Sequence, residues 1–143
     1  MKHKSLIFFT IMAMALFISS VVGRASEPMS EEEIKIYKKY EGNWGGGAWT
    51  AIESRHRFKE ASVEFQIGEI DSANRKAKVL YLWGESAKGQ AAGKRSYMAD
   101  CVDGKLIFET SKYRFELWMK GNDELFAQRK GNNPLEVILK RIK

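Results

Sequence analysis

Residues 95–120 read RSYMADCVDGKLIFETSKYRFELWMK. The pair Asp103-Gly104 separates two alternating runs, and an Asp-Gly pair suits the two positive-φ positions of a type I′ hairpin turn. The alternation continues to the end of the stretch, where one face carries Tyr113, Phe115, Leu117 and Met119 and the other carries Arg114, Glu116, Trp118 and Lys120. The stretch therefore predicts three consecutive antiparallel strands, each with one face in a core and one in water.

The same period of two extends outward in both directions, with turn residues between the runs. Eight strands are predicted, at about 44–52, 62–70, 76–83, 95–102, 106–110, 113–120, 124–129 and 135–142. No helix-length segment interrupts the series, so the connections are hairpins and the topology is an antiparallel meander. We expect an all-β, eight-stranded up-and-down barrel, because closure removes the exposed strand edges. An antiparallel β-sandwich is the alternative.

A short helix is predicted before the first strand, from about residue 31 to residue 40. Ser30 and Glu33 have the spacing of a capping box, which satisfies backbone donors at a helix N-terminus. Ile34, Tyr37 and Tyr40 recur at helical spacing and form one apolar stripe. The helix is expected to lie against the barrel as a lid or plug.

Residues 1–25 have the order of a secretory signal peptide: basic residues at Lys2 and Lys4, an apolar stretch from Leu6 to Val22, and the small residues Gly23 and Ala25 at the third-last and last positions before the cleavage site. An uncleaved membrane anchor is the alternative, since the apolar run approaches the length that spans a bilayer. Cleavage after Ala25 predicts an exported protein, periplasmic or extracellular. It leaves an N-terminal segment at 26–41 and a barrel domain at 42–143.

Charge and cysteine content narrow the function classes. Removal of Lys2, Lys4 and Arg24 lowers the formal net charge from +6 to +3, which is well short of the basic balance typical of nucleic-acid binding. Cys101 is the only cysteine, so no internal disulfide can form. We expect Cys101 to be a small buried apolar residue.

Two motifs and the last strand carry a family resemblance. Gly42-Asn43-Trp44 opens the first strand, Tyr81-Leu82-Trp83-Gly84 ends the third, and Arg141 lies in the eighth. Over residues 31–143 the chain resembles the calycin superfamily, in particular lipocalins, fatty-acid-binding proteins and small lipocalin-like bacterial envelope domains. The resemblance implies that Gly42 and Trp44 begin the strand at the closed end of the barrel, with Arg141 packed across Trp44.

An eight-stranded barrel holds either side chains alone or one small ligand. The candidate walls of an apolar pocket are the aromatic residues of the alternating runs: Phe65, Tyr81, Trp83, Phe108 and Phe115. The alternative is that these rings only fill the core.

The meander assigns four loops to the end away from Trp44, and this end is rich in basic residues: Arg55, Arg57, Lys59, Lys88, Lys94, Arg95, Lys112, Arg129 and Lys130. Such a mouth attracts anions, although basic residues also serve simply to keep loops soluble. Arg55, Arg57, Lys94 and Arg95 are the candidate contacts for an anionic ligand.

The residue inventory gives no support for catalysis. His56 is the only histidine after residue 25 and lies between Arg55 and Arg57, so neighbouring positive charge does not prepare it to act as a base. No pattern of metal ligands or of an oriented nucleophile is present. We expect no enzyme activity, no cofactor and no metal.

Two functions of different classes follow. The first is an exported lipocalin-like protein that binds a small apolar or amphipathic anion in the barrel; a cavity of about 300 Å³ or more would favour it. The alternative is an envelope protein-interaction or inhibitor module with a solid barrel core, anchored by an exposed Trp49 or Trp118. Neither hypothesis includes nucleic acid or, after cleavage, a membrane span.

Overall fold

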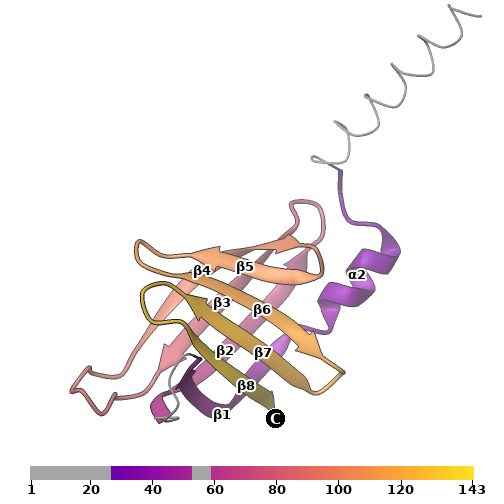
Figure 1. The fold of residues 1–143 in the computed structure, drawn as a ribbon. Helices are drawn as coiled ribbons and strands as arrows, with labels where there is room; N and C mark the ends of the chain where they lie inside the picture. Colours follow the sequence, from indigo (N-terminus) through magenta and orange to yellow (C-terminus); the bar gives the residue numbers. More distant parts are fainter. Residues whose placement is uncertain (1–26, 53–58) are drawn as a thin grey trace, which may run out of the picture.

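The computed structural model describes residues 27–52 and 59–143. Helix α2 (Glu31–Lys38) precedes eight antiparallel strands that pair in chain order and close on themselves (Figure 1). The strands are β1 (Gly42–Ala51), β2 (Lys59–Asp71), β3 (Lys76–Trp83), β4 (Gly93–Val102), β5 (Lys105–Glu109), β6 (Arg114–Lys120), β7 (Glu124–Lys130) and β8 (Leu135–Ile142). The predicted all-β up-and-down barrel is therefore confirmed, and the β-sandwich is excluded.

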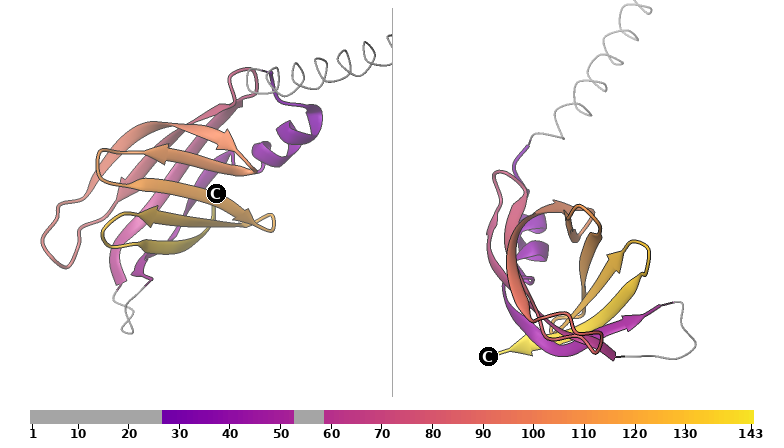
Figure 2. Two further views of the ribbon diagram at one scale, coloured as in Figure 1. Left: turned by 45° about the horizontal axis from the view of Figure 1, so that its top comes forward. Right: turned by 90° about the vertical axis from the view of Figure 1, so that its left-hand side faces the viewer.

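Closure takes place between the first and last strands. β1 pairs with β2 on one side and with β8 on the other, with Trp44 opposite both Phe65 and Arg141. The predicted tight hairpin joins β4 to β5, where Asp103 and Gly104 have φ of 50° and 78°. The view along the barrel shows the strands as a ring with α2 at its far end (Figure 2).

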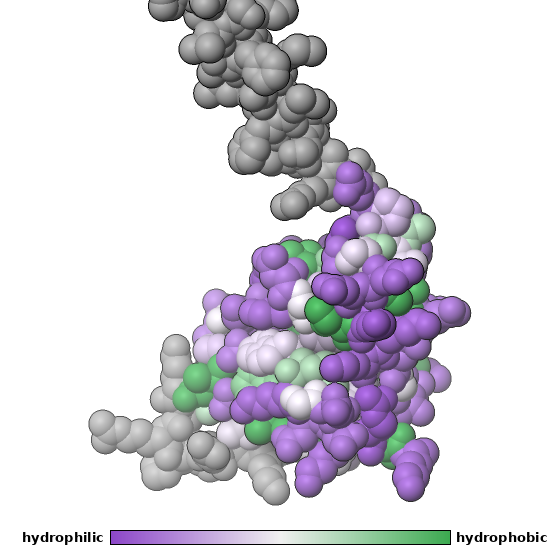
Figure 3. Space-filling view, turned by 90° about the vertical axis from the view of Figure 1, so that its right-hand side faces the viewer, coloured by the Kyte–Doolittle hydropathy of each residue, from purple (hydrophilic) through white to green (hydrophobic). Residues whose placement is uncertain are grey.

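Helix α2 covers one end of the barrel. Ser30 and Glu33 form the expected capping box, and the helix ends at Lys38, two residues before the predicted end. Tyr37 and Tyr40 are buried, and the Tyr40 hydroxyl donates to the carbonyl of Gly104 at 2.5 Å. The outside of this end is largely hydrophilic (Figure 3). The apolar stripe of the helix thus closes the barrel and its polar face meets water.

The half of the barrel nearest to α2 is a packed core. Its largest fully buried side chains include those of Trp44, Phe65, Leu106, Leu117 and Leu125. Cys101 is also buried, as expected. Within the described ranges, no helix is both long and apolar enough to cross a membrane.

Two side chains differ from the predicted alternation. Glu116, expected on the wet face of β6, is only 7% exposed, because Lys130 and Arg114 on the same outer wall pair with its carboxylate. Trp49, expected as an exposed anchor, is 1% exposed. A bulge in β1 shifts the pairing register between Trp44 and Gly47. One additional residue in a strand turns every later side chain to the opposite face, so Trp49 points into the barrel.

Candidate functional site

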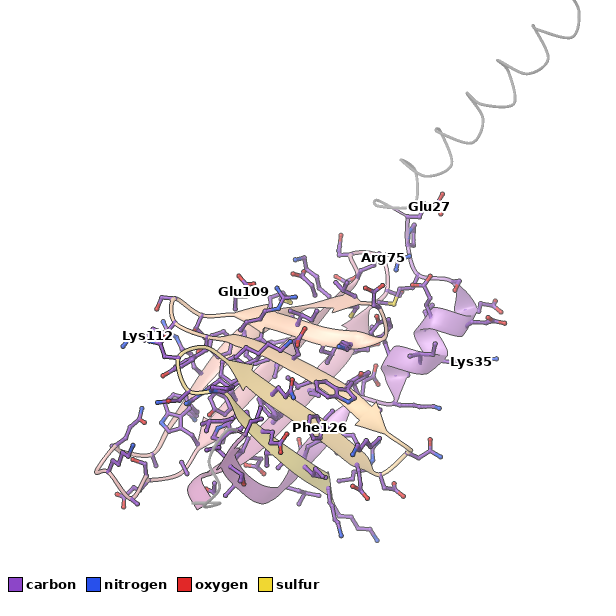
Figure 4. All side chains as sticks on the ribbon, in the orientation of Figure 1. Glu27, Lys35, Arg75, Glu109, Lys112 and Phe126 are labelled. Atoms are coloured by element: carbon purple, nitrogen blue, oxygen red, sulfur yellow. The ribbon has the colours of Figure 1, made fainter. Side chains whose placement is uncertain are left out.

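A cavity of about 260 Å³ lies at the end of the barrel away from α2 and opens to solvent. Lys112, in the β5–β6 connection, marks this end in Figure 4. The aromatic residues that line the cavity are Trp49, Tyr81, Trp83, Tyr97, Tyr113 and Phe115, and the remaining lining residues are Ala61, Ser86, Gln90, Arg95, Thr110, Ser111, Lys112 and Arg129. We call this cavity the mouth pocket.

The aromatic walls are side chains that the alternation along their strands points into the barrel. Tyr81 is central: its ring centroid lies 5.2 Å from that of Trp83 and 5.3 Å from that of Phe115. Trp49 Nε1 donates a hydrogen bond of 2.7 Å to the Tyr81 hydroxyl. Burial raises the pKa of Tyr81, so its hydroxyl keeps its proton at neutral pH. Trp49 and Tyr81 therefore form a fixed, uncharged wall.

The floor of the mouth pocket is closed by further rings. Phe115 lines the pocket and stacks on Phe108 at 4.7 Å with an interplanar angle of 9°. Phe65 packs against Tyr81 at 5.2 Å and is fully buried. Phe65 and Phe108, predicted as pocket walls, therefore lie in the core below the cavity. A ligand in the mouth pocket has no room to extend toward α2.

Local hydrogen bonds hold the rim. The Thr110 hydroxyl accepts from the backbone N–H of Tyr113 at 3.0 Å and from that of Lys112 at 3.2 Å. On the opposite side, Trp83 Nε1 donates to the carbonyl of Ala91 at 3.1 Å. These bonds fold the β5–β6 connection, which carries Tyr113, into a tight turn, and they tie the β3–β4 connection, which carries Ala91, to Trp83 at the end of β3.

Arg129 brings a positive charge into the mouth pocket. On β7 it follows the inward residues Leu125 and Ala127, and its Cζ lies 4.1 Å from the Tyr113 ring centroid and 5.9 Å from that of Trp49. Its Nε is buried and has no hydrogen-bond partner among the residues that the structure describes. A buried donor without a partner costs free energy. The same burial keeps Nε out of contact with the cavity, so a bound acceptor would pair with the terminal nitrogens of the guanidinium.

Of the four predicted basic contacts, the structure places one at the pocket and one away from it. Arg95 is opposite the inward residue Tyr81 on β3 and lines the pocket rim. Lys94 is opposite Leu82, is exposed, and lies on the outer wall, away from the pocket. Arg55 and Arg57 lie outside the described residues.

Sequence reasoning placed Tyr81, Trp83, Phe115 and Arg95 at the site and did not assign pocket roles to Trp49, Tyr97, Tyr113 or Arg129. Alternation along β7 and β4 would have placed Arg129 and Tyr97 on the inward faces. Only Trp49 required knowledge of the bulge. Comparison of the chain with protein-family models, with curated proteins and with solved structures finds no match.

Proposed function

We propose that this protein is an exported, non-enzymatic, lipocalin-like barrel that binds one compact amphipathic anion in the mouth pocket. The closed eight-stranded barrel is compatible with a calycin-like fold. The observation that carries the proposal is the Arg129 guanidinium, which lies among aromatic rings in a cavity open to solvent. Its buried Nε has no hydrogen-bond partner among the described residues, which costs free energy. The side chain as a whole is only partly buried, so an anion in the cavity can pair with its positive charge.

The dimensions of the pocket restrict the ligand. At about 260 Å³ the cavity does not reach the roughly 300 Å³ that we gave as favouring a ligand-binding barrel, and Phe65, Phe108 and Phe115 fill the space beneath it. A long, fully inserted acyl chain does not fit. The proposed ligand is therefore compact, with its apolar part against the rings and its anionic group at Arg129.

Native mass spectrometry tests this proposal on protein purified from cells that express the full chain. The expected result is a stoichiometric excess mass that is lost on denaturation and that an Arg129→Met variant lacks. Bare protein that also fails to bind octanoate and naphthalene-2-carboxylate in calorimetry would overturn the proposal. The denatured mass also tests export, because cleavage after Ala25 predicts the mass of residues 26–143.

The second candidate function is a protein-interaction module, and one feature of the outer wall favours it. Trp118 and Phe126 pack at 4.4 Å on the outside of β6 and β7, and Ile138, opposite Phe126 on β8, is 45% exposed. The buried Trp49 cannot serve as an anchor. A photo-reactive residue at position 138 should then form one dominant adduct in intact cells, whereas the same residue at position 94 should not.

A further inference from the structure

The walls of the mouth pocket are aromatic to an unusual degree. Among the lining residues that the structure describes, the apolar side chains are six aromatic rings and the methyl group of Ala61. Aromatic pairs in offset or edge-to-face geometry gain free energy beyond the area that they bury. A ligand with a planar aromatic ring gains this additional stabilisation in the pocket, whereas an aliphatic chain that buries a similar area does not.

The rings are already held in an arrangement that suits a further ring. Trp49 meets Tyr81 edge-on at 71°, and the Phe115 ring is tilted by 56° to that of Tyr81. The Trp49–Tyr81 hydrogen bond and the Trp83–Ala91 hydrogen bond fix three of the aromatic side chains. Because the walls are ordered before binding, the binding of a rigid ligand costs little additional conformational entropy in the protein or in the ligand.

Arg129 determines the kind of anion. Its guanidinium lies over the Tyr113 ring, with Cζ 4.1 Å from the ring centroid, and the side chain lines the pocket. A carboxylate that approaches the two terminal nitrogens of a guanidinium accepts two parallel hydrogen bonds from them. A carboxylate is thus the anionic group whose geometry matches the planar fork of Arg129.

A cationic ligand is the main competitor, because aromatic cages bind quaternary ammonium groups. Here the cation–π positions over Tyr113 and Trp49 are already taken by Arg129. Arg95 and Lys112 add positive charge at the rim. The pocket therefore repels cations and attracts anions.

We infer that the ligand is a planar aromatic carboxylate, with its ring against the aromatic walls of the mouth pocket and its carboxylate paired with the two terminal nitrogens of Arg129. This inference rests on the proposed function and names the ligand class of the same pocket. It assigns Arg129 as the specificity-determining residue for the charged group. The aromatic walls select against aliphatic acids.

Isothermal titration calorimetry on the full chain tests the inference with three probes: naphthalene-2-carboxylate, decanoate and the neutral 2-naphthylmethanol. The expected result is that the aromatic carboxylate binds about tenfold or more tightly than either other probe. Arg129→Met should remove the advantage over the neutral probe. Lys94→Met removes one positive charge from the outer wall of the same end and should leave all three affinities unchanged.

The failures of the two proposals are distinguishable. If decanoate binds as tightly as naphthalene-2-carboxylate, the aromatic class is overturned and the anion-binding function stands. If neither carboxylate binds, both are overturned.

If Arg129→Met remains folded by circular dichroism and keeps the full preference for the charged probe, the role of Arg129 is overturned. An Arg129→Lys variant keeps the charge but not the planar fork, so undiminished affinity in it would contradict the pairing through two parallel hydrogen bonds.

Discussion

The guanidinium of Arg141 lies over the indole ring of Trp44, with its Cζ 4.2 Å from the ring centroid. Its terminal nitrogens also donate to the carbonyls of Glu41 at 2.8 Å and Lys39 at 2.9 Å. One side chain of β8 therefore holds the start of β1 and the chain that follows α2. This is the contact expected from the resemblance to calycin barrels.

Replacement of Arg141 should weaken barrel closure. Arg141→Leu removes the cation–π contact and two charge-assisted hydrogen bonds, so we expect a loss of about 2 kcal/mol in the free energy of unfolding. Arg141→Lys keeps the charge over the ring but loses the planar fork of donors. Its free energy of unfolding should lie between those of the wild type and Arg141→Leu. Urea unfolding measures both variants. An unchanged midpoint in Arg141→Leu would show that closure does not depend on this contact.

The Tyr40 hydroxyl attaches the helix end of the chain to the barrel interior. It donates to the carbonyl of Gly104 at 2.5 Å and accepts from the backbone N–H of Met119 at 3.3 Å. Tyr40→Phe leaves both backbone groups without this partner, and we expect the free energy of unfolding to fall by about 1–3 kcal/mol. Ile36→Ala, at a side chain that is 49% exposed on the same helix, is the control and should change thermal stability little.

Cys101 should be unreactive in the folded protein. Burial and, to a smaller extent, the neighbouring Asp100 carboxylate raise the pKa of the Cys101 thiol to about 11. The thiolate is the reactive form, so labelling with a disulfide reagent at pH 8 should be slower on the order of a hundredfold in native than in urea-unfolded protein. Equal rates in the two states would show that Cys101 is accessible and would contradict its place in the core.

The strands, the hairpin at Asp103-Gly104 and the helix cap were predictable from the sequence because each depends on residues that are close in the chain. The mouth pocket was only partly predictable. Alternation indicates that Tyr81 and Phe115 point inward, but not that Phe65 lies below the cavity, since depth depends on strand stagger around the barrel. Trp49 was misplaced because counting by twos from Trp44 ignores the bulge at Gly45–Gly46, although the run of glycines indicated irregular backbone there.

Glu116 should make the stability of the barrel depend on pH. Its carboxylate is buried on the outer wall and paired with Lys130 and Arg114. The hydrogen bond from Lys130 is the main cause of the lowered pKa of Glu116, which lies below its ordinary value of about 4.5. A carboxylate with a lowered pKa contributes stability that is complete above the ordinary value and is lost as pH falls through the folded-state pKa.

Glu116→Gln keeps the shape of the side chain and removes this charge. At pH 7 we expect the free energy of unfolding to fall by about 1 kcal/mol. The loss is small because the side chains of Lys130 and Arg114 are about half exposed, so water screens their attraction to Glu116. The difference from wild type should become smaller as pH falls below about 4.5, as measured by urea unfolding at pH 7 and pH 3. Glu109→Gln is the matched control. Glu109 also pairs with Arg114, but its side chain is 64% exposed, so this substitution should lower the free energy of unfolding by only a few tenths of a kcal/mol. A Glu116→Gln deficit that is equal at pH 7 and pH 3 would indicate lost packing, not a lost charge.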